Sequence, residues 1–172
     1  DEAVPLFRDG VEFGWRATLA GHRVVTCPAA RITHRQAGRL GRRTGTLAEA
    51  AGRSPGAFDR LMAMRTVSAH AHGVVAAGVR LRLVLGSLLR ALGYLVGKRP
   101  DLSAEEMQAC GDFLRSGAAV RALRGRVAAL RPTVAARRRV ARLRPHRWSS
   151  WAVGLDAVAR SVSERLRGFT SG

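Results

Sequence analysis

The chain has 172 residues, of which 30 are basic and 12 acidic, and its formal net charge is +18. This length suits one domain with its own core, or part of a domain with an appendage. Its two cysteines, Cys27 and Cys110, are too few for a disulfide framework and too far apart for a paired metal motif. The positive charge favours a phosphate-bearing partner. The excess of basic residues has another explanation, the codon bias of a GC-rich genome, which enriches arginine, alanine and glycine.

The first 36 residues differ in composition from the rest and hold four of the twelve acidic residues. Apolar side chains at every fourth position predict a helix over Val11–Ala20, ended by Gly21, which tolerates the left-handed conformation. We expect His22–Thr26 and Arg31–His34 to be short extended strands, separated by a proline. The N-terminal region is therefore predicted to be a short α/β piece.

The rest of the chain predicts a flexible glycine-rich and arginine-rich linker over residues 37–57, followed by a helical region over residues 58–172. The clearest helix covers Val79–Gly97. Its arginines and small residues fall on one face and its leucines on the other, with Leu83 as the exception. The predicted apolar face consists of Leu81, Val84, Leu85, Leu88, Leu89, Leu92, Leu95 and Val96.

A membrane crossing is one interpretation of this apolar helix. A span needs about 20 mostly apolar residues. Arg80, Arg82 and Arg90 interrupt this one, and each costs about 2.5–3.5 kcal/mol at the centre of a span. The two-faced pattern favours a helix that lies in the plane of the membrane interface or on a protein surface.

Further helices follow. Residues 103–106 match a capping box, which predicts the start of a helix. The apolar stripe of that helix is expected to be Met107, Cys110 and Leu114. The stripe of the next helix, which ends before Pro132, is Val120, Leu123, Val127 and Leu130. A last helix is predicted over residues 149–168, with the seam Trp151, Leu155, Val158, Val162 and Leu166.

The C-terminal helices are strongly basic. Residues 113–155 contain eleven arginines and no acidic residue. Single-stranded nucleic acid is usually bound by basic residues together with aromatic ones that stack on bases, and residues 115–147 contain no aromatic side chain. The pattern therefore favours an anionic membrane surface, worth about 1 kcal/mol per basic residue, over nucleic acid. A solvated face without a partner is the remaining alternative.

Three short strings near the N-terminus carry the only pattern typical of a reaction. Residues 7–17 read FRDGVEFGWRA, residues 20–24 read AGHRV, and residues 28–34 read PAARITH. Together they resemble the late part of the catalytic domain of family 2 glycosyltransferases, which have a GT-A type fold. The likeness is strongest to the bacterial galactofuranosyl- and rhamnosyltransferases of cell-wall polymers. A looser likeness over residues 81–98 is to the membrane-proximal tails of large actinobacterial members.

The resemblance implies roles for individual residues. Asp9 matches the first acid of the family's acidic pair, Glu12 the acid that follows, Arg16 the helix arginine, and His34 the histidine that helps to hold a divalent metal on the donor diphosphate. The second acid of the pair is the family's general base, and Gly10 stands in its place. Either Asp9, at the start of a helix, accepts the proton of the acceptor hydroxyl instead, or this copy has lost its base.

The expected activity is an inverting transfer from a nucleotide-sugar to a cell-surface polysaccharide or glycolipid. Asp9 and Glu12 are expected to be catalytic, Trp15 and Arg16 to contact substrate, and His34 to bind Mg²⁺ or Mn²⁺ in a complete catalytic domain. Trp15 is also a natural core residue. The expected place is the cytoplasmic face of the plasma membrane.

The sequence also favours a piece of a longer enzyme. It opens on Asp1, and it contains neither an Asp-x-Asp donor motif nor N-terminal nucleotide-binding strands, so this chain alone is not expected to bind a sugar nucleotide well. The expected fold is mainly α, with residues 1–36 as the short α/β end of a GT-A-like domain, followed by amphipathic, arginine-rich helices. The alternative is a non-catalytic, membrane-associated basic helical protein that descends from such an enzyme.

Overall fold

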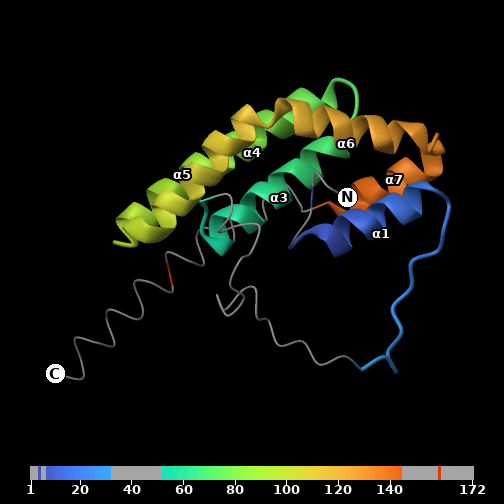
Figure 1. Cartoon of the computed structure of the whole chain (residues 1–172), viewed down its shortest axis with the longest axis horizontal. Helices are drawn as coiled ribbons and strands as arrows, with labels where there is room; N and C mark the ends of the chain where they lie inside the picture. The colour runs from blue at the N-terminus through green and yellow to red at the C-terminus, as the bar shows by residue number, and fades with distance from the viewer. Residues whose placement is uncertain (1–3, 5–6, 32–51, 145–158, 160–172) are drawn as a thin grey trace.

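The computed structural model describes residue 4, residues 7–31, residues 52–144 and residue 159. Within these ranges the chain forms six helices and no strand. Figure 1 shows them in chain order: α1 (Asp9–Leu19), α3 (Pro55–Ala69), α4 (Val75–Val96), α5 (Pro100–Arg115), α6 (Gly117–Ala129) and α7 (Val134–Leu143).

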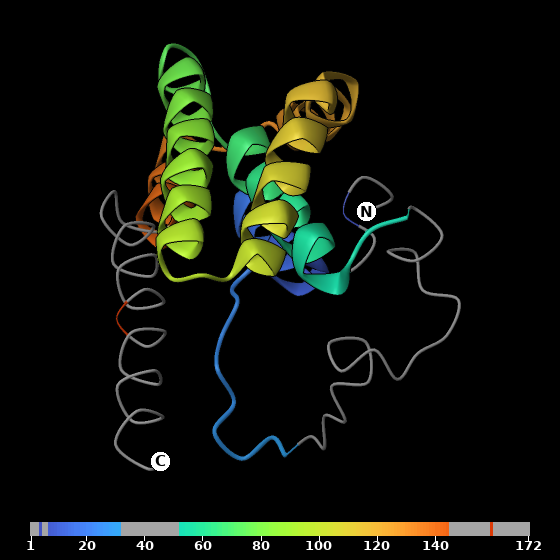
Figure 2. The same cartoon turned by 90° about the vertical axis from the view of Figure 1, so that its left-hand side faces the viewer.

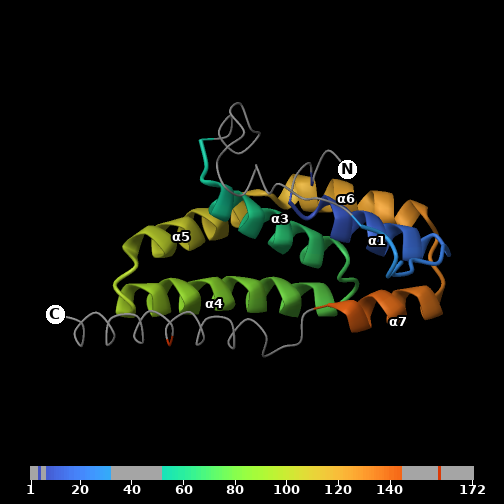
Figure 3. The same ribbon diagram turned by 90° about the horizontal axis from the view of Figure 1, so that it is seen from below.

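The helices pack in two groups. Helix α3 contacts α4, α5 and α6; α4 also packs along α5, and α1 packs against α7. In both Figure 2 and Figure 3, α4 and α7 lie on the same side of the molecule, and α5 and α6 lie on the other. Helix α3 is therefore the central element, and the outer surfaces of α4 and α7 belong to one side of the protein.

One hydrophobic core joins all six helices. Trp15 and Leu19 of α1 belong to it together with most of the apolar residues of α3. Helix α1, which lies N-terminal to the predicted linker, is thus packed on the helical region. The largest fully buried apolar side chains are Phe113, Leu61, Met62, Met64, Leu123, Val4, Val120, Val127 and Val140.

Local sequence signals explain where several helices begin and end. The Ser54 side chain accepts a hydrogen bond from the backbone N–H of Ala57 at 3.1 Å, directly before α3, whose first residue is Pro55. Thr133 caps α7 in the same way. Helix α1 ends as predicted, because Gly21 adopts the left-handed conformation with φ of 93°.

The predicted α/β piece at the N-terminus is wrong. The segment His22–Thr26 is exposed irregular backbone, and so is the rest of the described chain up to Arg31. A strand shares its backbone hydrogen bonds with a neighbouring strand, and the described residues offer none to pair with. The other predicted strand, Arg31–His34, lies outside the described residues except for Arg31. The part of the chain that the structure describes is all-helical.

Two details of the helical region also differ from the prediction. Helix α5 begins at Pro100, so the predicted capping residue Ser103 lies inside the helix and is buried. Its apolar stripe is Ala109, Cys110 and Phe113, whereas Met107 and Leu114 are exposed. The predicted stripe of α6 is confirmed at Val120, Leu123 and Val127. Helix α3 begins at Pro55, within the range predicted as linker; residues 37–51 lie outside the described residues.

Candidate functional site

The two predicted catalytic acids, both in the first turn of α1, differ in burial. Asp9 is the first residue of the helix, and its side chain is exposed. Glu12 lies three residues later, on the face that packs into the body, and none of its surface reaches solvent. The Glu12 carboxylate lies 3.3 Å from the guanidinium of Arg16, one helical turn away, and accepts no hydrogen bond within the described chain. Only Asp9 is therefore open to a substrate hydroxyl in this arrangement.

Trp15 is a core residue that links α1 to the end of α3. Its ring meets the ring of His70 edge-on, with 5.2 Å between the centroids, and both side chains are buried. His70 Nδ1 lies 2.9 Å from the backbone carbonyl of Thr66. Burial lowers the pKa of His70, the charges of Arg144 and Arg16 lower it further, and the hydrogen bond to Thr66 acts in the opposite direction. A neutral His70 thus completes the contact between the two helices.

The structure brings Glu12, Trp15 and Arg16 together on or beside the inner face of α1 and leaves Asp9 outside. His34, the predicted metal ligand, lies outside the described residues. Within the ranges that are described, no three His, Cys, Asp or Glu side chains are grouped in a way that could hold a metal ion.

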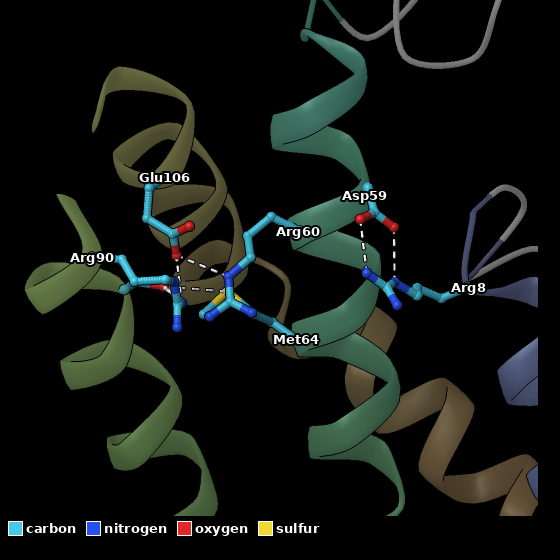
Figure 4. A network of polar contacts seen from close by, with 7 residues as sticks. Arg8, Asp59, Arg60, Met64, Arg90 and Glu106 are labelled. Atoms are coloured by element: carbon cyan, nitrogen blue, oxygen red, sulfur yellow. Dashed lines mark hydrogen bonds and ion pairs between the residues drawn. The ribbon is translucent and has the colours of Figure 1, made fainter. Parts of the chain in front are cut away.

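A buried ionic cluster joins α3, α4 and α5 (Figure 4). The Oε1 atom of Glu106 accepts hydrogen bonds from Arg60 Nε at 2.8 Å and from Arg90 Nη2 at 2.6 Å. Arg90 also donates to Ser87 Oγ, and the Ser87 hydroxyl lies 3.7 Å from the sulfur of Met64. One carboxylate from α5 is thus shared by guanidinium groups from two other helices. We call Arg60, Arg90 and Glu106 the ionic cluster.

The sequence did not predict the ionic cluster, although it contained a signal for part of it. Arg90 shares the predicted polar face with Gly86 and Ser87, and an arginine among small residues is typical of a helix face that meets another helix closely. Glu106 appeared to be a capping residue, because three positions separate it from Ser103. Its true role follows from α5 beginning at Pro100.

Helix α4 differs from most surface helices in which side it buries, because its large apolar side is the exposed one. Its buried residues are mostly small or polar, including Ala76, Gly86, Ser87 and Arg90. Its large apolar residues face outward, with exposed fractions between 38% and 67%. Leu83, the exception to the predicted apolar face, is the one leucine of α4 that is buried, at 7%. We call the exposed set the α4 leucine face: Leu81, Leu85, Leu88, Leu89, Leu92, Leu95 and Val96.

Helix α7 lies on the same side of the molecule as α4 (Figure 3). Ala136 and Val140 pack inward, whereas Arg138, Arg139 and Arg142 are exposed. We call these three exposed residues the α7 arginine strip. The outer surfaces of α4 and α7 therefore combine an apolar strip with a cationic one.

The acidic residues of the described helices are elsewhere. Helix α4 contains none, and neither do α6 and α7. No described helix combines the length and the apolar content that a membrane crossing requires. The α4 leucine face is thus a contiguous apolar surface on the outside of the body, next to a region of positive charge.

No protein-family model matches the chain, and neither the search of curated proteins nor that of solved structures found a match.

Proposed function

We propose that the helical body binds the surface of an anionic membrane, with the α4 leucine face in the interface and the α7 arginine strip on lipid phosphates. The outward direction of the α4 leucines is the observation that carries this proposal. Large contiguous apolar patches are rare on soluble proteins and mark surfaces that bind a partner. A long helix with one apolar face and positive charge nearby is typical of helices that lie in the plane of a membrane.

The free energies involved are sufficient for reversible binding. Complete burial of a leucine side chain is worth about 1.5–3 kcal/mol, and roughly half of that remains to be gained where the side chain is already half-buried. The apolar residues of the face therefore offer about 5–10 kcal/mol before the loss of motional freedom is counted. Each arginine near an anionic leaflet adds about 1 kcal/mol. Apolar burial dominates, and charge selects the lipid.

Vesicle co-sedimentation tests this function. The full chain is expected to bind vesicles that contain phosphatidylserine, to bind neutral phosphatidylcholine vesicles more weakly, and to lose affinity as salt is raised. The double variant Leu88→Asp/Leu92→Asp places two charges on the α4 leucine face and is expected to lower the affinity at least about tenfold.

The matched control is Met107→Asp/Leu114→Asp, which makes the same kind of change at exposed apolar residues of α5. This control is expected to bind as the unaltered chain does. Equal binding by the two double variants would contradict the role of the α4 leucine face. Equal binding to charged and neutral vesicles would contradict the role of the arginines.

A second candidate is the function that the glycosyltransferase resemblance implies. In this proposal the chain is part of an inverting enzyme that transfers a sugar from a nucleotide-sugar to a surface glycan or glycolipid, and the helical body keeps the enzyme at the cytoplasmic face of the membrane. The exposed position of Asp9 at the start of α1 supports it, because the helix dipole stabilises a carboxylate there. Mg²⁺ or Mn²⁺ on the donor diphosphate belongs to the same proposal.

Activity of the longer enzyme that the resemblance implies would test this candidate. Asp9→Asn is expected to lower the rate of sugar transfer by about 10²–10⁴, the usual worth of a general base. His34→Ala is expected to lower the rate and to change its dependence on the metal. Asp101→Asn, at an exposed acid of α5, is the control. Unchanged rates and an unchanged metal response would remove Asp9 and His34 from the reaction.

A further inference from the structure

We infer that the α4 leucine face is also the docking surface of the chain's own C-terminal residues 149–168, which cover it when no membrane is present. This inference names the regulation of the proposed membrane surface. It rests on the proposed function only for its consequence, which is that lipid displaces the segment. The docking itself can be tested without lipid.

The point at which the described chain ends supports this occupant. Arg144, the residue after α7, donates a hydrogen bond to the backbone carbonyl of His70, shortly before α4 begins. Burial lowers the pKa of Arg144, and the nearby charge of Arg82 on α4 lowers it further. The segment that follows Arg144 therefore starts next to the first turns of α4.

The length of the segment matches the face. Helix α4 has 22 residues and is about 33 Å long. Residues 149–168 would span about 30 Å as a helix. The intervening residues 145–148 reach at most about 14 Å, which keeps the start of the segment near the start of α4. Residues 149–168 can therefore run parallel to α4 along its whole length, because residues 145–148 are long enough to connect them.

The side chains of the segment match the face as well. The predicted seam places Trp151, Leu155, Val158 and Val162 on one side, with the spacing of a helix that packs along another helix. The match between residues 149–168 and the α4 leucine face is thus apolar, along the predicted seam.

Thiol labelling in the absence of lipid tests the docking. The probe is Leu88→Cys in the full chain, with the exposed Cys27 changed to serine and the buried Cys110 retained. The reference probe is Met107→Cys on α5, since Met107 and Leu88 have similar exposed fractions of 46% and 42%. Docking predicts that a maleimide reacts with the Leu88→Cys chain at least about tenfold more slowly than with the Met107→Cys chain.

A second set of substitutions distinguishes docking from a slow maleimide reaction that has a local cause. Val158→Asp/Val162→Asp disrupts the seam and is expected to bring the labelling of Leu88→Cys to the rate of the reference probe. Val153→Asp, on the opposite side of the predicted helix, is the matched control and should leave the slow rate unchanged. A fast rate for Leu88→Cys in the unaltered chain would overturn the inference, and so would a slow rate that Val158→Asp/Val162→Asp does not change.

Further outcomes distinguish docking of residues 149–168 from binding of a second copy of the chain, and test it separately from the proposed membrane function. Protection that depends on protein concentration would assign the face to a second copy of the chain and would overturn the inference. Protection at all concentrations, in a chain that does not bind anionic vesicles, would support the docking and contradict the proposed membrane function. Release of protection by phosphatidylserine vesicles, but not by phosphatidylcholine vesicles, supports both.

Discussion

Helices α3 and α4 follow each other in the chain, yet they are buried in different ways. Near its C-terminal end α3 is buried on all sides, since Thr66, Val67, Ser68 and Ala69 are all buried in succession. Helix α4 buries one side only, and that side is made mainly of small and polar residues. A helix with neighbours all around it needs no apolar periodicity, whereas a helix at the surface can turn its most apolar side either way.

The ionic cluster and the small residues explain why α4 turns its leucines outward. Gly86, Ser87 and Ala91 are small residues on the buried side of α4, and Arg90 on the same side reaches Glu106. Turning the leucines inward would place bulky side chains where these small residues now lie. It would also separate Glu106 from one of its two arginines.

The largest expected effect comes from removing the charge that orients α4. Glu106→Gln leaves the guanidinium groups of Arg60 and Arg90 close together without a carboxylate, and breaking a buried ion pair from one side costs about 3–5 kcal/mol. We therefore expect a fall of about 3 kcal/mol in the free energy of unfolding, measured by urea denaturation. Asp101→Asn, which breaks the exposed pair with Arg99, is expected to cost less than about 1 kcal/mol. Similar losses in both variants would contradict the orienting role of the ionic cluster.

A smaller effect distinguishes the two sides of α4 directly. Leu83→Ala opens a cavity in the core and is expected to lower the free energy of unfolding by about 2–3 kcal/mol. Leu92→Ala, at a leucine that is more than half exposed, is expected to cost less than about 1 kcal/mol once Val158→Asp/Val162→Asp has disrupted the docking of residues 149–168. Thermal denaturation of the two variants measures the difference. If Leu92→Ala proved as costly as Leu83→Ala when that docking is disrupted, the outward direction of the α4 leucines would be contradicted.

The smallest expected effect concerns the end of α3, where His70 is buried against Trp15. The pKa of His70 is lowered in the folded protein, so the unfolded chain binds a proton first as the pH falls. The stabilisation from neutral His70 is complete above the unfolded pKa of about 6.5 and is lost as the pH falls below it, towards the lower folded value.

Denaturation curves between pH 7.5 and about pH 5, above the main range of carboxylate titration, measure this loss. His70→Gln should reduce the dependence and leave the part that comes from His72, whose pKa burial also lowers. His22→Gln, at an exposed residue, should leave it unchanged. A dependence that is the same in all three proteins would show that another group is responsible.

The sequence predicted the helices better than the segments between them and better than the burial of individual side chains. Regular apolar spacing located α1 and the stripe of α6, and Gly21 marked the end of α1, because these features depend on neighbouring residues alone. The strand predicted over His22–Thr26 is wrong, because a strand depends on a partner elsewhere in the chain. Of the candidate site, the sequence indicated which residues share α1, but it did not show that Glu12 would be buried while Asp9 stays exposed.

For this protein the sequence by itself determined the positive charge, the helical character and the two-sided pattern of α4, since composition and periodicity are local properties. Only the tertiary structure decided that Arg90 points inward to Glu106 and that the leucines point out. That decision depends on which side fits closely against α3 and α5, and such a fit arises from residues that are far apart in the chain.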